Sequence, residues 1–383
     1  MVEGRSSRLN LILLFLGMYL FIWSLSGLKE SWVLAFAADG KEGLARSYID
    51  RMTDNPLSAL CLGVLATALV QSSSGVVAVT IATVAAGGMT VQQSVPLIMG
   101  ANIGTTVTCV IVTLGYAIRK REFSKAVPVA LLNDVVKTLT VAFLFLVELY
   151  TNVLSDSAVY VADILGGLPI LDFFLGGFPD LLDVVIDPIL KPVQSVFVAF
   201  FNGSIYSAVS LGVMSFAVLI LGLEMMGNAA ENAIRGRASH YVHLAFKTPR
   251  RGLFLGTSFA SLLQSSSVAT SLAIPFTASG KISLKEVYPY LLGCNIGTTI
   301  DPGQIASYVK FGVMGLNVGL VHVFINVFSV CLWFGVPGLA NIPLKLTKAL
   351  SDVILSSKNS TIALSAFTIS LFYIIPLLVI YLL

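Results

Sequence analysis

Long apolar segments, separated by short polar ones, run along almost the whole chain. Most approach the length of about 20 residues that an α-helix needs to cross a hydrocarbon core of about 30 Å. The pattern therefore predicts an all-α polytopic membrane protein. The predicted spanning helices cover approximately residues 9–27, 97–117, 127–150, 205–227, 289–309, 312–335 and 361–382.

Two more apolar stretches, 57–87 and 253–280, are each interrupted in the middle by the same polar block, Gln-Ser-Ser-Ser. Each arm has about 14 residues, which at about 1.5 Å per residue is too short to cross the core. We therefore predict that each stretch forms a re-entrant helical hairpin. Its polar tip must then be buried in protein or line a water-filled cavity.

The polar blocks belong to an internal repeat. Gln71 and Gln264, which open the two Gln-Ser-Ser-Ser blocks, are 193 residues apart, and so are Asn102 and Asn295, which open two copies of Asn-Ile-Gly-Thr-Thr. At this offset, 16 of 44 aligned positions are identical from residue 63 onward. Two related halves that build one site are typical of secondary transporters.

The repeat divides the chain into four predicted parts. These are a first half at 1–150, an extracytoplasmic connector at 151–204, a second half at 205–340, and a C-terminal part at 341–383. The connector is rich in Gly and Pro, which favours short amphipathic helices at the outer surface. Lysines within the apolar segment 344–355 predict an interfacial helix on the inner side, before the last spanning helix.

The charges predict how the halves are oriented. The apolar run 9–28 follows two arginines and lacks a small-residue cleavage site, so we expect a retained helix with a cytoplasmic N-terminus. Counting crossings from there places the basic segments 118–126 and 228–251 inside and the acidic segment 151–203 outside, as the positive-inside rule requires. The first hairpin then enters from outside and the second from inside. The two halves are therefore predicted to be inverted repeats.

Composition narrows the function classes. The 383 residues are 56% hydrophobic and 11% charged, whereas soluble domains average about 25% charged residues. The sequence shows neither a phosphate-cradling P-loop nor a convincing nucleophile–base arrangement, so an enzyme is not expected. Basic residues occur only in short clusters, and these give no support for nucleic-acid binding.

The duplicated motifs carry the chemistry of a small-ion site. Hydroxyl and amide oxygens coordinate Na⁺, while hydroxyl, amide and backbone N–H groups bind an oxyanion. Gly104 and Gly297 would let the helix open within Asn-Ile-Gly-Thr-Thr, which exposes further carbonyl and N–H groups. We therefore expect each half to contain a discontinuous helix. Among the few charged residues within predicted spans, Asp134 and Lys137 stand three apart on one helix and can pair.

In these motifs the chain resembles the type II sodium-dependent phosphate cotransporters. The resemblance implies Na⁺-coupled uptake of inorganic phosphate by alternating access, and the connector without cysteine suits a bacterial member in the inner membrane. In this interpretation Na⁺ is the coupling ion and supplies the countercharge, because the motifs contain no Arg or Lys. Asp301 stands where the family pattern leads us to expect a hydroxyl.

From the motifs and the resemblance we assign two sets of site residues. The predicted phosphate ligands are Gln71, Ser72, Ser73, Ser74, Asn102, Thr105, Ser266, Ser267 and Asn295. The predicted Na⁺ ligands are Gln264, Ser265, Thr298, Thr299 and Asp301. The alternatives are a Na⁺-coupled carrier of another small anion, such as a dicarboxylate or sulfate, and an anion channel. The expected partners are phosphate, Na⁺ and the lipid bilayer; a homo-oligomer is compatible with the sequence, and nucleic acid is not expected.

Overall fold

The chain folds as a bundle of helices. The structure, a computed structural model, describes residues 2–38, 44–166, 168, 178–234, 246, 248–278 and 282–383. These residues form helices and turns and contain no strand. Six of the described helical segments are long and apolar enough to cross a membrane. The predicted all-α polytopic class is thereby confirmed, although parts of the segments 151–203, 228–251 and 253–280 lie outside the described residues.

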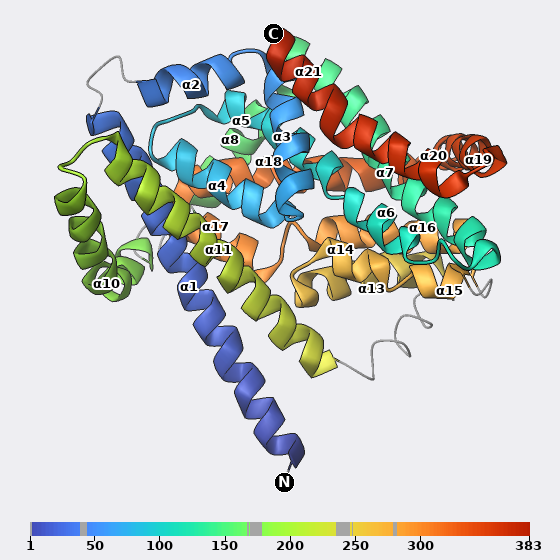
Figure 1. Cartoon of the computed structure of the whole chain (residues 1–383), viewed down its shortest axis with the longest axis horizontal. Helices are drawn as coiled ribbons and strands as arrows, with labels where there is room; N and C mark the ends of the chain where they lie inside the picture. The colour runs from blue at the N-terminus through green and yellow to red at the C-terminus, as the bar shows by residue number, and fades with distance from the viewer. Residues whose placement is uncertain are drawn as a thin grey trace.

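The first helices of the two halves pack against each other. They are α1 (Val2–Ala38) and α11 (Ile205–Ile234), which lie side by side on one side of the molecule (Figure 1). A Cβ at Gly222 would lie 2.9 Å from the carbonyl oxygen of Gly17, so the two backbones touch at their crossing. Both helices extend beyond the predicted 9–27 and 205–227, because helical structure continues past the apolar stretch.

The two segments predicted to be re-entrant each fold as helices joined at the polar block. In the first half α3 (Pro56–Val70) and α4 (Ser73–Ala85) meet at the polar block. In the second half α13 (Pro249–Leu263) leads into a return arm that is itself divided into α14 (Ser266–Ser271) and α15 (Ile274–Ala278).

Each hairpin is followed by a helix that breaks at Asn-Ile-Gly-Thr-Thr. The first consists of α5 (Val91–Gly104) and α6 (Val107–Leu114), and the second of α16 (Leu284–Gly297) and α17 (Pro302–Lys310). The predicted discontinuity is therefore present in both halves. In the second half the gap is wider, and α16 and α17 together are not among the six long spans.

Glycines bring the first arm of each hairpin directly against the broken helix of the same half. The residues involved are Gly63, Gly100 and Gly104 in the first half and Gly256, Gly293 and Gly297 in the second. A Cβ at any of them would collide with a backbone carbonyl of the facing helix. Because no side chain separates the two backbones, the hairpin arm and the broken helix form one tightly packed unit.

The third long helices of the two halves meet in the centre of the molecule. They are α7 (Lys120–Thr151) and α18 (Gly312–Val330), the latter continuing into a π-helical turn η2 (Cys331–Gly335). The indole Nε1 of Trp333 donates to Oγ1 of Thr140 at 2.7 Å. These two residues are 193 positions apart and thus equivalent in the repeat. Equivalent residues can touch each other only close to an axis that relates the two halves.

Several predicted boundaries were wrong. Most of segment 118–126, expected as a loop, forms the start of α7, where Arg119 and Glu122 are paired at 3.2 Å. Charged residues can continue a helix beyond the hydrocarbon core, so polarity did not mark its end. The short helix α2 (Leu44–Thr53) was not predicted.

The remaining helices belong to the predicted connector and to the C-terminal part. The connector contains α8 (Val153–Gly166) and α10 (Phe178–Phe200), which has 23 residues and is longer than the short helices expected there. The predicted interfacial helix corresponds to α19 (Asn341–Ser356). The last predicted span is interrupted by a π-helical turn and comprises α20 (Ser360–Ile369), η3 (Ser370–Ile374) and α21 (Ile375–Leu382).

The close contact between α13 and α16 leads us to predict an effect on stability. We expect Gly293→Ala to destabilise the protein by about 1–3 kcal/mol, because its Cβ would overlap the carbonyl of Leu253 and force α13 and α16 apart. Gly335→Ala is the matched control, since a Cβ there meets nothing within 4 Å. Thermal unfolding of the detergent-solubilised protein would measure both. Equal unfolding temperatures for the two variants would contradict the packing argument.

Candidate functional site

The tip of the first hairpin is a two-residue turn held by its own helices. Gln71 ends α3 in the left-handed region with φ 57°, and Ser72 caps α4 by accepting a hydrogen bond from the N–H of Gly75 at 3.1 Å. Ser73 and Ser74, which follow, are the buried first residues of α4. The turn therefore directs a helix N-terminus and two hydroxyls into the protein interior.

The second tip has the same local geometry. Gln264 ends α13 with φ 52°, and Ser265 accepts from the N–H of Val268 at 3.2 Å. Ser266 and Ser267 then open α14 and are buried. The two glutamines differ, however. Gln264 is buried with no hydrogen-bond partner for its Oε1 among the described residues, whereas Gln71 is exposed.

The first tip is bonded to the broken helix of the second half. The hydroxyl of Ser74 donates to Oδ2 of Asp301 at 3.2 Å, and Nε2 of Gln304 donates to the carbonyl of Ser74 at 3.0 Å. Asp301 also caps α17, since its Oδ1 accepts from the N–H of Gln304 at 2.8 Å. Tyr308 closes the network by donating to the carbonyl of Thr299 at 2.8 Å.

The second tip reaches the broken helix of the first half in return. Thr270, one turn into α14, lies 3.1 Å from Sγ of Cys109 on α6. This tip has one such contact, whereas Ser74 of the first tip makes two hydrogen bonds to the opposite half. Each hairpin thus contacts the distal half of the other half's broken helix.

Two pairs of asparagines also connect the two halves, at the Asn-Ile-Gly-Thr-Thr motifs. Nδ2 of Asn102 donates to Oδ1 of Asn326 at 3.3 Å, and Nδ2 of Asn295 donates to Oδ1 of Asn133 at 3.1 Å. The four side chains are buried, and both pairs obey the offset of 193 residues. Each Asn-Ile-Gly-Thr-Thr segment is therefore held by the long helix of the opposite half.

The motif threonines direct their hydrogens into the backbone. Thr105 and Thr298 donate to the carbonyls of Ala101 and Cys294, each at 3.0 Å. Thr299 likewise donates to Ile296 at 2.8 Å. Each hydroxyl oxygen then keeps only lone pairs, which suit a cation better than an anion.

Among the assigned residues, a few side chains are tied to particular partners. Ser74 and Asp301 contact each other. Asn102 and Asn295 instead contact Asn326 and Asn133, which we had not assigned to the site. Oδ1 of Asn295 has no partner among the described residues. Its Nδ2 gives one of its two hydrogens to Asn133, so the side chain offers this free acceptor and a single remaining hydrogen.

Sequence reasoning missed Gln304, Tyr308 and the partner asparagines as parts of the site. Asn133 and Asn326 carried a signal, because they share the repeat offset. Gln304 and Tyr308 carried none, since Ile111 and Gly115 occupy the equivalent positions in the first half.

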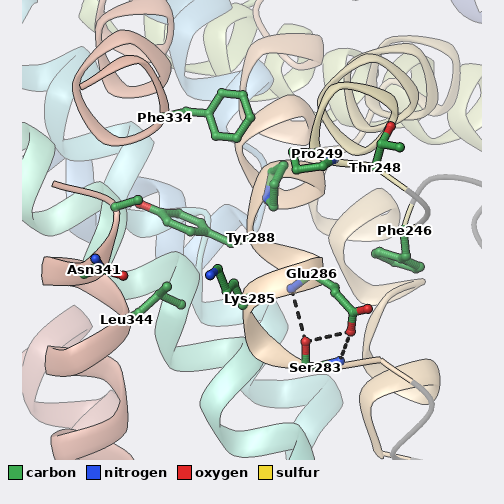
Figure 2. Close-up of a pocket in the computed structure, with 12 residues that line it drawn as sticks. Phe246, Thr248, Pro249, Ser283, Lys285, Glu286, Tyr288, Phe334, Asn341 and Leu344 are labelled. Atoms are coloured by element: carbon green, nitrogen blue, oxygen red, sulfur yellow. Dashed lines mark hydrogen bonds between the residues drawn. The ribbon is translucent and has the colours of Figure 1, made fainter. Parts of the chain in front are cut away.

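A separate cavity of about 490 Å³ lies away from the motifs (Figure 2). The starts of α13 and α16 line it together with Phe334 of η2 and Leu344 of α19. Ser283 and Glu286 form the capping box of α16 at its edge, and the hydrogen bonds from Ser283 lower the pKa of the Glu286 carboxyl. No assigned site residue lines this cavity, so it is not part of the candidate site.

Comparison with known proteins identifies relatives along most of the chain. The family model described as Na⁺/Pi-cotransporter matches residues 20–172 and 218–340. Sodium-dependent phosphate transport protein 2A of Ovis aries is 28% identical over 90% of this chain and 63% of its own length. Protein 2B of Homo sapiens is 26% identical over 97% of this chain and 64% of its own length. The chain thus spans less than two thirds of these relatives. No solved structure matches the chain significantly.

The asparagine bridges predict a measurable coupling. Asn295→Ala and Asn133→Ala should together cost less than the sum of the two single variants, because either change alone breaks the same bond. A side-chain hydrogen bond within a membrane protein contributes about 0.6 kcal/mol on average, with a maximum near 1.7. Unfolding of the four variants in mixed micelles gives the coupling energy. The matched control is Asn295→Ala with Asn326→Ala, which do not bond each other, and equal coupling there would contradict a direct bond.

Proposed function

The chain belongs to the Na⁺/Pi-cotransporter family, and on this premise we propose that it couples Na⁺ influx to the uptake of inorganic phosphate. The observation that best supports the proposal is the reciprocal contact between each polar hairpin tip and the broken helix of the opposite half. Two half-sites held against each other in this way suit one shared binding site near the membrane midplane.

In the proposed site the serine hydroxyls of both tips bind phosphate. Ser73 and Ser74 are buried at the N-terminus of α4, where unbonded N–H groups favour an anion. The hydroxyl of Ser74 donates to Asp301, so Ser74 would contribute through the helix N-terminus rather than through its hydroxyl. Ser266 and Ser267 supply hydroxyls from the opposite half. Asn102, Ser72 and Gln71 keep their assignment to the phosphate site as a proposal, and the exposed side chain of Gln71 makes it the least enclosed of the set. Thr105 is moved to the Na⁺ set, because its hydroxyl hydrogen is donated to Ala101.

Na⁺ is proposed to bind where buried oxygen atoms accept no hydrogen bond. Oε1 of Gln264 and Oδ1 of Asn295 have no partner among the described residues, so we move Asn295 from the phosphate set to the Na⁺ set. Ser265, Thr298 and Thr299 remain proposed ligands through their oxygens.

Asp301 also stays in the Na⁺ set. It is completely buried, and its bonds to Ser74 and Gln304 leave its charge without a basic partner in the described part of the chain.

Charge explains why the two ions would be cotransported. A doubly charged anion at the midplane is costly without a countercharge, and so is a buried cation. Each ion then binds favourably only when the other is present, which is a reciprocal coupling free energy. Alternating access would follow from movement of the hairpin units against the outer helices α1 and α11. We place the protein in a bacterial inner membrane as a multi-pass transporter with inverted repeats.

Transport in proteoliposomes tests the proposal. The purified protein should accumulate ³²P-phosphate when a Na⁺ gradient is imposed, and Gln264→Ala with Ser265→Ala should lose most of this uptake by removing proposed Na⁺ ligands. Gln92→Ala with Ser258→Ala, at one exposed and one half-buried position outside the assigned site, is the matched control and should transport normally. Full uptake by the first variant would refute the ligand assignment. Stronger competition by sulfate or a dicarboxylate than by phosphate would refute the substrate.

The inverted orientation has its own test. Gln92 and Lys285 are exposed, lie in the first turns of α5 and α16, and are equivalent in the repeat. In a Cys331→Ser background, which removes the one exposed native cysteine among the four, Gln92→Cys should react with an impermeant maleimide in intact spheroplasts. Lys285→Cys should react only after permeabilisation. Labelling of both from the same side would show that the repeats are parallel.

A further inference from the structure

The cavity shown in Figure 2 lies between two groups of helices. One wall is formed by the starts of α13 and α16, which the glycine contacts hold together as one unit. The other wall is formed by Phe334 of η2 and by Asn341 and Leu344 at the start of α19, a helix that packs against α7. Its volume of about 490 Å³ is typical of small-ligand sites, which range from about 300 to 1,000 Å³. The cavity is therefore large enough for a ligand that contacts both groups.

Three basic side chains gather at this end of the two helices. Lys285 lines the cavity in the first turn of α16, and Arg250 and Arg251 stand in the first turn of α13, directly after two of its lining residues. All three are exposed, and none forms an ion pair within the described part of the chain. The carboxylate that lines the cavity, Glu286, is already bonded to the hydroxyl and the N–H of Ser283. The positive charge beside the cavity is therefore largely uncompensated.

These cations stand where a helix disfavours them. A helix N-terminus carries a partial positive charge, which stabilises anions and destabilises cations. The first turn of α13 nevertheless has two arginines and no acidic residue. The equivalent residues of the first half, Leu57, Ser58 and Gln92, are uncharged. The positive-inside rule accounts for basic residues on one side of the membrane, but it does not require that they surround a cavity. An anion bound there would be stabilised by both helix ends and by the three cations.

Tyr288 gives the cavity an unused hydrogen-bond donor. Its side chain lines the cavity and is 3% exposed, and its hydroxyl has no partner among the described residues. In Figure 2 its ring extends from α16 toward Asn341 at the start of α19. A buried hydroxyl without a partner is destabilising, and a ligand oxygen that accepts its hydrogen would remove that cost. With Phe334 and Leu344 as apolar walls, the cavity suits a ligand with an apolar chain, an oxygen acceptor and an anionic group.

The surface around the cavity is apolar as well as basic. Phe254, one turn after Arg250 on α13, is 70% exposed. On α19 the exposed side chains include both Leu346 and two lysines, Lys345 and Lys348. Apolar and basic side chains on one helix are typical of contact with an anionic membrane surface. In the predicted topology this end faces the cytoplasm, and the leaflet on that side contains anionic lipids. The ligand that fits these surroundings therefore comes from the bilayer.

We propose that the cavity binds an anionic phospholipid of the inner leaflet. Part of one acyl chain lies against Phe334 and Leu344, and the hydroxyl of Tyr288 donates to an ester oxygen. The phosphate lies between Lys285 and the two arginines of α13. Such a lipid joins the unit of α13 and α16 to η2 and α19, so it stabilises the arrangement described above. The site is separate from the ion-binding motifs, and the proposal does not depend on the proposed transport function.

Lipid titration followed by native mass spectrometry tests the proposal. The detergent-solubilised protein should bind its first phosphatidylglycerol on the order of tenfold or more tightly than phosphatidylcholine with the same acyl chains. Lys285→Gln should weaken phosphatidylglycerol binding about fivefold by removing one cation. Lys358→Gln, which removes an exposed lysine beyond the other end of α19, is the matched control and should leave it unchanged. Equal affinities of the wild-type protein for the two lipids, or an unchanged affinity in Lys285→Gln, would overturn the proposal.

Two further variants separate the cavity from general attraction to the basic surface. Tyr288→Phe should weaken phosphatidylglycerol binding about threefold to tenfold. It should not lower the unfolding temperature without lipid, because the hydroxyl that it removes has no partner. Ala340→Trp places an indole in the cavity and should remove the preference for phosphatidylglycerol although all three cations remain.

The remaining outcomes decide where the anion comes from and where it binds. A preference for phosphatidylglycerol that persists in Ala340→Trp would show that the lipid binds on the outer surface, which would overturn the cavity as its site. Displacement of phosphatidylglycerol by an equal concentration of inorganic phosphate would show that the site binds a soluble anion, which would overturn the lipid. A lower unfolding temperature of lipid-free Tyr288→Phe would show that the hydroxyl has a structural role, which would overturn its role as donor to the lipid.

Discussion

Backbone that leaves the helix at membrane depth must find its hydrogen-bond partners inside the protein. The backbone of each half of this chain leaves the helix twice, at a hairpin tip and at a broken helix. Part of the solution lies in the opposite half. Ser74 of the first tip is bonded to Asp301 and Gln304 of the second half, and each motif asparagine is bonded to a long helix of the other half. Neither half could satisfy its own polar groups in this way if it stood alone.

The two halves differ in how many polar groups at their hairpin tips are hydrogen-bonded. At the first tip Ser74 is bonded to Asp301 and Gln304, and Tyr308 extends the network to Thr299. At the second tip Oε1 of Gln264 has no partner among the described residues. Fully bonded groups stabilise the fold, whereas unbonded oxygens are available for a ligand. The repeat thus supplies the framework, and in the proposed function its unequal completion supplies places for different ions.

Features that depend on the repeat or on apolar length could be predicted from the sequence. The hairpins followed from arms too short to span, and the breaks followed from glycine within a polar motif. Helix ends were less predictable, because α1 and α7 continue beyond the apolar core, where solvent tolerates any helix-forming residue. Gln304 could not be identified, since its role depends on a contact with Ser74 that lies 230 residues away. The pairing of Asp134 and Lys137, expected from their spacing, is not formed among the described residues, because spacing fixes the helix face and not the rotamer.

The glycine contacts between each hairpin arm and its broken helix have a mechanical consequence. Backbones that touch without intervening side chains cannot slide or separate by small side-chain adjustments. We therefore expect α3 with α5, and α13 with α16, to move as two rigid units. A hairpin tip cannot move away while the hairpin arm and the broken helix of its unit stay in place. In the proposed alternating access, the route to the centre would change by tilting a whole unit of hairpin arm and broken helix. One spectroscopic label on a hairpin arm would then report the displacement of the neighbouring broken helix as well.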